Sequence, residues 1–138
     1  MVVPIFALKR KRNNKKLKNM ATINLTTNDF KRRVADLEAT AGEWKFLGDK
    51  PAVIDFFATW CGPCKALSPV LEEISAEYAG KVDIYKVDID KEEPLLEMFD
   101  IRSVPTLIFV PMKGSPERAM GVMAKDRLRE LLDELIKK

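Results

Sequence analysis

The spacing of hydrophobic residues changes along the chain, and each change predicts a different element. Residues 52–58 (A-V-I-D-F-F-A) form a nearly continuous apolar run, which is typical of a strand buried on both faces. Residues 63–78 place apolar side chains at helical spacing and predict an amphipathic helix, kinked by Pro69. Residues 82–88 alternate as a strand does. This order of strand, helix and strand predicts a parallel strand pair with a right-handed crossover.

The second half of the chain predicts a hairpin closed by a helix. Residues 92–99 are predicted as a short helix, in which Pro94 falls in the first turn. Residues 106–110 and about 118–123 have the length and spacing of two antiparallel strands. Leucines at helical spacing over residues 125–138 then predict the last helix.

An entry region precedes this core. Residues 21–25 predict a short strand, and Thr26 followed by Asp29 resembles a capping box. Apolar residues at helical spacing then predict a helix that continues to about Thr40. The whole order, β-α-β-α-β-α-β-β-α, predicts an α/β protein with a central mixed sheet and helices on both faces.

Charge is distributed unevenly along the chain. Residues 1–20 hold seven of the 24 basic residues and no acidic one, which leaves 17 basic and 21 acidic residues elsewhere. We predict a basic, disordered N-terminal tail over 1–20 and one domain over 21–138. Two alternatives stay open: Met20 is the true start, or the apolar stretch 2–8 and the basic run anchor the chain to an anionic membrane. The acidic remainder predicts no specific nucleic-acid partner.

Composition excludes several classes of protein. The chain has 138 residues, 46% of them hydrophobic and 33% charged, which is ordinary for one globular domain. No apolar run approaches the roughly 18 residues of a transmembrane segment, and no export signal is recognisable, so we expect a cytoplasmic protein. Two cysteines and no histidine exclude a disulfide-dense scaffold, Ser-His or Cys-His catalysis, and a His-ligated metal.

The strongest chemical signal is Trp-Cys-Gly-Pro-Cys-Lys at residues 60–65, between a predicted strand and a predicted helix. Only a thiolate attacks a disulfide, and a helix N-terminus favours the anion, so Cys61 is the predicted nucleophile. Cys64 lies one turn further on and is predicted to resolve the mixed disulfide. Two alternatives are half of a zinc site, which lacks two further cysteines in this chain, and an inert pair in the core.

These residues resemble the thioredoxin family. The motif W-C-G-P-C-K is that family's active-site motif, and the resemblance covers about residues 52–137. Further matches are V-I-D-F-F-A before the motif, Pro69, K-V-D-I-D at 86–90, I-R-S-V-P-T at 101–106 and Gly121. The resemblance implies the thioredoxin fold and a monomer that reduces disulfides in target proteins, with roles in electron transport and cell redox homeostasis. It also implies thioredoxin reductase as electron donor, and neither a bound cofactor nor a metal.

Two charged residues acquire roles from the resemblance. Asp55 matches the family's buried acid behind the second cysteine, and its place in an apolar run predicts a raised pKa, which suits a proton carrier for Cys64. Lys86 matches the lysine that tunes this acid. The alternatives are a structural hydrogen bond for Asp55 and a solvent-facing charge for Lys86.

A docking face also follows from the resemblance. Pro105 matches the family's cis-proline, and Val104 before it would offer backbone hydrogen bonds to an extended substrate; the alternative is an ordinary trans proline that begins a strand. The remaining rim is Trp60, Gly62, Pro63 and Gly121.

Three departures from the family pattern concern partner choice more than chemistry. Phe57 replaces a common tryptophan, residues 41–51 form a longer connection, and residues 111–116 contain two prolines. An oxidant or isomerase, and a binding module that does not need its thiols, therefore remain as alternative functions.

Overall fold

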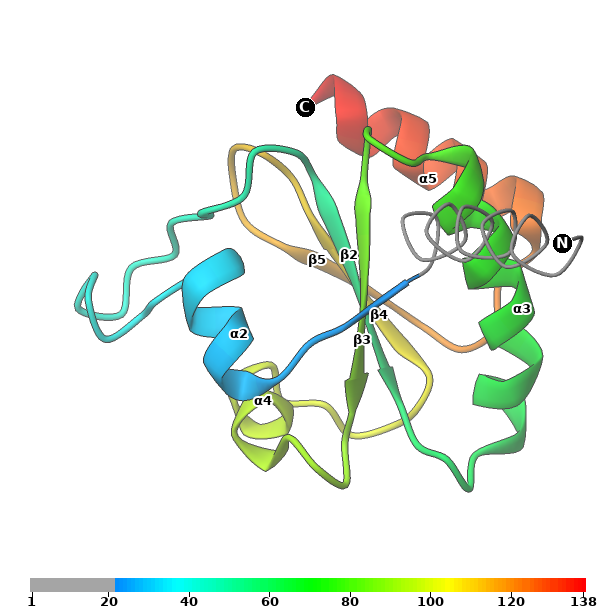
Figure 1. Ribbon diagram of the computed structural model, residues 1–138, viewed down its shortest axis with the longest axis horizontal. Helices are drawn as coiled ribbons and strands as arrows, with labels where there is room; N and C mark the ends of the chain where they lie inside the picture. The colour runs from blue at the N-terminus through cyan, green and yellow to red at the C-terminus, as the bar shows by residue number, and fades with distance from the viewer. Residues whose placement is uncertain (1–21) are drawn as a thin grey trace, which may run out of the picture.

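The computed structural model describes residues 22–138 and shows a central sheet between two pairs of helices (Figure 1). The predicted tail over residues 1–20 lies outside the described residues. The strands are β1 (Ile23–Asn24), β2 (Ala52–Phe57), β3 (Asp83–Asp88), β4 (Thr106–Val110) and β5 (Glu117–Met120). The helices are α2 (Thr27–Arg33), α3 (Gly62–Glu77), α4 (Glu93–Met98) and α5 (Lys125–Lys137).

The sheet is mixed, and its strand order is β1-β3-β2-β4-β5. β2 runs parallel to β3 and antiparallel to β4, while β4 and β5 form an antiparallel hairpin. The predicted β-α-β unit is therefore confirmed, as is the hairpin. β2 lies in the middle of the sheet. The chain that leaves its carboxyl end therefore begins α3 near the centre of that edge of the sheet.

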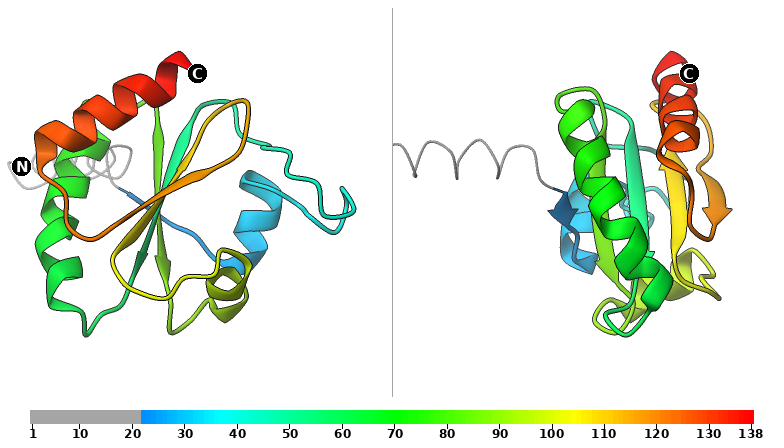
Figure 2. Two further views of the ribbon diagram at one scale, coloured as in Figure 1. Left: turned by 180° about the vertical axis from the view of Figure 1, so that it is seen from behind. Right: turned by 90° about the vertical axis from the view of Figure 1, so that its right-hand side faces the viewer.

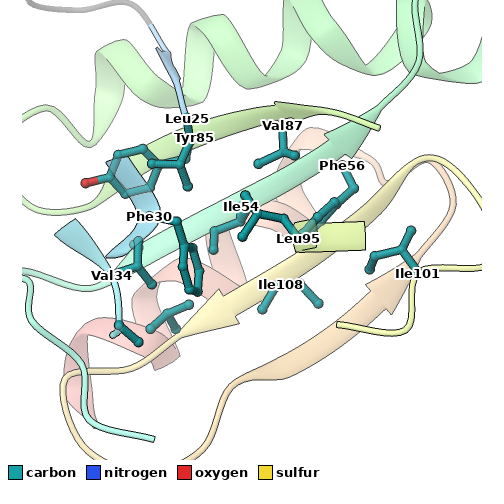
Figure 3. Packing of buried hydrophobic residues seen from close by; sticks show 13 residues of the cluster. Leu25, Phe30, Val34, Ile54, Phe56, Tyr85, Val87, Leu95, Ile101 and Ile108 are labelled. Atoms are coloured by element: carbon teal, nitrogen blue, oxygen red, sulfur yellow. The ribbon is translucent and has the colours of Figure 1, made fainter. Parts of the chain in front are cut away.

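Helices cover both faces of the sheet, as predicted (Figure 2). Because successive strand residues point to opposite faces, Ile54 and Phe56 contact the cluster under α2 and α4, whereas Val53 contacts the cluster under α3 and α5. Figure 3 shows the first cluster, in which Phe30 and Leu95 pack against the sheet. The β2 run is apolar almost throughout because both faces are buried.

The helix predicted to reach Thr40 ends much earlier, and this prediction was wrong. α2 ends at Arg33, and the carbonyl of Val34 accepts a hydrogen bond from the backbone N–H of Leu47 at 2.9 Å. The returning segment places the Trp44 ring 6.4 Å from that of Phe30, measured between centroids. Tertiary contacts of the long connection thus replace the helical hydrogen bonds that periodicity alone had predicted.

Other boundaries differ by a few residues. β1 has two residues where five were predicted. β5 ends before Gly121, whose φ of 89° places it in the left-handed region that favours glycine. The side chain of Thr26 caps α2 by accepting from the Asp29 N–H at 3.1 Å, but the Asp29 carboxylate pairs with Arg32 instead of completing a capping box. Within residues 22–138, no helix combines the length and the apolar character needed to cross a bilayer.

Candidate active site

The two cysteines lie at the start of α3, shortly after the end of β2. Cys61 is the N-cap of α3, and its Sγ accepts a hydrogen bond from the Cys64 N–H at 3.2 Å. Pro63 occupies the first turn, where a missing N–H leaves no helical hydrogen bond unmade. A disulfide joins Cys61 to Cys64, whose Cα atoms are 5.3 Å apart. Both residues are largely buried, with exposures of 6% for Cys61 and 5% for Cys64.

The segment before β4 lies against this pair. Sγ of Cys61 is 3.7 Å from the carbonyl oxygen of Val104. The bond between Val104 and Pro105 is cis, as predicted, and Pro105 is buried. The N–H of Gly121 donates to the Pro105 carbonyl at 2.9 Å, which holds the end of the β4–β5 hairpin next to Pro105. Val104, Pro105 and Gly121 are thus gathered beside the cysteines although they lie 40 or more residues away in sequence.

An apolar pocket adjoins the pair, and Val104 is one of the residues that line it. Trp60 is 68% exposed, and its Nε1 donates to the Asp90 carboxylate at 2.9 Å. Gly62 and Pro63, from the same rim, are exposed too. Sequence reasoning missed the apolar residues that complete the pocket with Trp60 and Val104, which are Ile89, Leu96 and Ile101. The signal was present, because Ile89 and Ile101 belong to two of the stretches that carry the family resemblance.

Asp55 is buried in the middle of β2, on the face that α3 covers. Its exposure is 2%, and its Oδ1 has no hydrogen-bond partner among the described residues. Burial raises the pKa of Asp55 from an ordinary 3.8 to about 6, and the Lys86 ammonium offsets part of that rise. No described residue gives Oδ1 the structural hydrogen bond of the alternative interpretation.

Lys86 lies beside Asp55 on the neighbouring strand, since the two are register partners of β3 and β2. Its Nζ donates to Ser68 Oγ at 3.0 Å and lies 4.6 Å from the centroid of the Phe57 ring. Lys86 is half-buried and lines an open pocket together with Phe57, and the salt bridges of the described residues do not include a Lys86–Asp55 pair. Sequence reasoning missed Ser68, which nothing in the local pattern distinguishes.

The site has the chemistry of disulfide exchange. Zinc needs about four ligands, and residues 22–138 hold no group of three or more Cys, Asp or Glu placed to share an ion. A Cys-x-x-Cys disulfide at a helix N-terminus, beside an apolar pocket and following a strand that carries a buried acid, has the groups that disulfide exchange uses. Fold and site together define a protein thiol–disulfide oxidoreductase.

Comparisons with known proteins give the family. The family model described as Thioredoxin matches residues 21–134. The chain belongs to the thioredoxin family, and its fold is the thioredoxin fold. A thioredoxin of Borreliella burgdorferi is 42% identical over 112 residues, which cover 81% of this chain and 95% of the relative. A thioredoxin of Staphylococcus aureus is 46% identical over 83 residues, covering 59% and 79% of the two chains.

Solved structures agree with this assignment. The crystal structure of chloroplastic thioredoxin z superposes with a TM-score of 0.71 at 25% identity, covering 86% of this chain and 96% of that one. A thioredoxin of Malassezia sympodialis has a TM-score of 0.67 at 30% identity, with coverages of 84% and 91%. The chain is accordingly a protein-disulfide oxidoreductase that acts on disulfide-containing proteins.

Proposed function

We propose that Cys61 attacks target disulfides and that Cys64 completes their reduction. The Cys61 thiolate bonds to one target sulfur and expels the other as a thiolate. Cys64, once deprotonated, then attacks Cys61 Sγ, which forms the Cys61–Cys64 disulfide and releases the second target thiolate. Two electrons pass from the cysteine pair to the target. The observation that carries this assignment is that Cys61 caps α3, where the unpaired N–H groups and the helix dipole favour its anion.

Asp55 accepts the proton that Cys64 must lose. A proton acceptor works best when its pKa lies near the working pH, and burial raises the pKa of Asp55 to about 6. The orphaned Oδ1 supports this role, because it leaves a lone pair free for a proton. Lys86 tunes the acid through its positive charge.

The target chain docks along the rim of the cysteine pair. Val104 offers its backbone to an extended substrate segment beside the cis-proline Pro105. An apolar side chain of the target enters the pocket next to Trp60, whose exposed ring would be covered on binding. Gly62, Pro63 and Gly121 form the rest of the docking face.

The setting of the reaction follows from the same chemistry. The Gly-Pro dipeptide between the cysteines resembles that of the reducing members of the superfamily, which supports a monomeric cytoplasmic reductase in an electron-transport chain. Thioredoxin reductase, or a comparable donor, returns two electrons to the Cys61–Cys64 disulfide after each cycle.

Insulin reduction with dithiothreitol as donor tests the proposal. We expect the wild-type protein to precipitate the insulin B chain and the Cys61→Ser variant to be inactive. The Cys64→Ser variant is the matched control, because it retains the nucleophile and accumulates a mixed disulfide at Cys61. Wild-type activity no higher than that of Cys61→Ser, or a mixed disulfide through Cys64 in the Cys61→Ser variant, would reject the assignment.

A further inference from the structure

The Lys86 ammonium is held by a residue that has no assigned role. Ser68 lies in α3, four residues after Cys64 and hence one turn along the same helix face. Its Oγ accepts a hydrogen bond from Lys86 Nζ at 3.0 Å, and the Phe57 ring centroid lies 4.6 Å from the same nitrogen. These two contacts fix the ammonium from two sides, one through a hydrogen bond and one through a cation–π interaction.

The neighbouring strand carries a competing acceptor for the same ammonium. Asp55 is the register partner of Lys86, so both side chains stand on one face of adjacent strands. The Asp55 Oδ1 lacks any hydrogen-bond partner among the described residues. An ammonium that lost its Ser68 contact would have that donor free, and the Asp55 oxygen without a partner is an acceptor on the neighbouring strand.

We propose that Ser68 is a positioning residue for disulfide exchange, which holds the Lys86 ammonium against Phe57 and so prevents it from pairing directly with Asp55. A direct pair would hold the carboxylate in its charged form and occupy the oxygen that must take the proton. With Ser68 in place, Asp55 remains a buried carboxyl group with a free oxygen. This inference rests on the proposed function, since it concerns the same proton transfer.

Few charged groups lie where they could change the pKa of Asp55. Lys86, on β3, is the charged group of the described residues that acts on the pKa of Asp55. On the opposite side its register partner is Leu107 of β4, and α3 presents Leu67 to this face of the sheet. In the oxidised protein the two cysteines do not titrate. The titration of Asp55 in that form therefore reports on the distance of the Lys86 ammonium.

The test is the titration midpoint of the Asp55 carboxyl carbon, followed by NMR in the oxidised full-length protein. We expect Ser68→Ala to lower the midpoint by about one pH unit or more, as a newly adjacent cation does. Ser68→Thr keeps the hydroxyl and should match the wild type. Ser75→Ala is the matched control, because Ser75 is a serine of the same helix outside this contact, and it should also leave the midpoint unchanged.

The outcomes separate the inference from the proposed function. An unchanged or raised midpoint in Ser68→Ala, or a shift in Ser68→Thr or Ser75→Ala as large as that in Ser68→Ala, overturns the positioning role. Insulin reduction by the wild type is measured alongside. Its absence would reject the proposed function whatever the titration shows, because the titration needs neither substrate nor free thiols.

Discussion

Asp55 combines near-complete burial, an oxygen without a hydrogen-bond partner and a position inside an apolar strand. Such a group costs free energy whenever it is charged in the folded protein. Stability therefore does not explain why an acid occupies position 55. The proposed proton transfer does.

The stability cost of Asp55 depends on pH in a defined direction. Its pKa is about 6 in the folded protein and 3.8 in its ordinary state, so the folded protein retains a proton that the unfolded chain releases between these values. The stabilisation is complete below about pH 3.8 and is lost as the pH rises through about 6. Asp55→Asn removes this dependence while nearly conserving volume.

We expect the free energy of unfolding of Asp55→Asn, relative to that of the wild type, to rise by roughly 2 kcal/mol between pH 4 and pH 8. A pKa difference of about 2.2 at 1.36 kcal/mol per unit sets the upper bound at about 3 kcal/mol, and part of it is already lost at pH 4, close to the ordinary pKa of 3.8. Urea denaturation of the two oxidised proteins at both pH values measures it. Parallel pH profiles of the two proteins would show that the pKa of Asp55 is the same in the folded and unfolded states.

Trp60 is the residue for a test of docking. Its ring is 68% exposed and forms one wall of the apolar pocket. We expect Trp60→Ala to raise KM for a protein disulfide about tenfold, since an aromatic residue at the centre of an interface contributes over 1 kcal/mol. The rate with a small aromatic disulfide should hardly change. Equal losses with both substrates would place the defect in the cysteine pair instead of the docking face.

At the scale of elements, α5 packs on the molecule through one apolar stripe. Leu128, Leu132 and Leu135 are buried against the sheet and α3, whereas the opposite face is charged. A connection of four residues after β5 suffices to bring this stripe onto the sheet. Periodicity in the sequence predicted the helix and its inward face correctly for this reason.

We expect Leu132→Ala, at a fully buried position, to reduce the free energy of unfolding by 2–5 kcal/mol, a range typical of buried leucine truncations. Ile136→Ala is the matched control in the same helix, because Ile136 is 41% exposed and its truncation should cost less than about 1 kcal/mol. Chemical denaturation of both variants gives the comparison. Equal losses would mean that α5 does not pack by the face described.

α2 shows where element prediction fails. Phe30 and Val34 have helical spacing and are buried, and Leu37 continues the pattern, yet the helix ends at Arg33. Trp44 and Leu47 return to contact Phe30 and Val34 respectively, and these contacts need the chain to turn back. The local spacing of apolar residues does not show that residues about ten positions later will form contacts that compete with the helix.

At the scale of the whole molecule, we propose that residues 21–138 are an independent folding unit. The two hydrophobic clusters on the faces of the sheet are both made of described residues, and the family model begins at residue 21. We expect a chain without residues 1–20 to keep its unfolding free energy within about 0.5 kcal/mol, a change typical of surface alterations, and to retain insulin reduction. A loss of either activity or more than about 1 kcal/mol would assign the N-terminal segment a part in the domain.

The sequence by itself determined the order of all the described elements, the cysteine pair at the start of α3 and, through the family resemblance, the residues beside it. Spacing along a helix or strand follows from local geometry, so these features are readable without the fold. Only the tertiary structure decided that Ser68 holds Lys86, that Asp55 has a free oxygen and that Ile89 and Ile101 complete the pocket. Those contacts join separate elements, and their distances depend on how the elements pack.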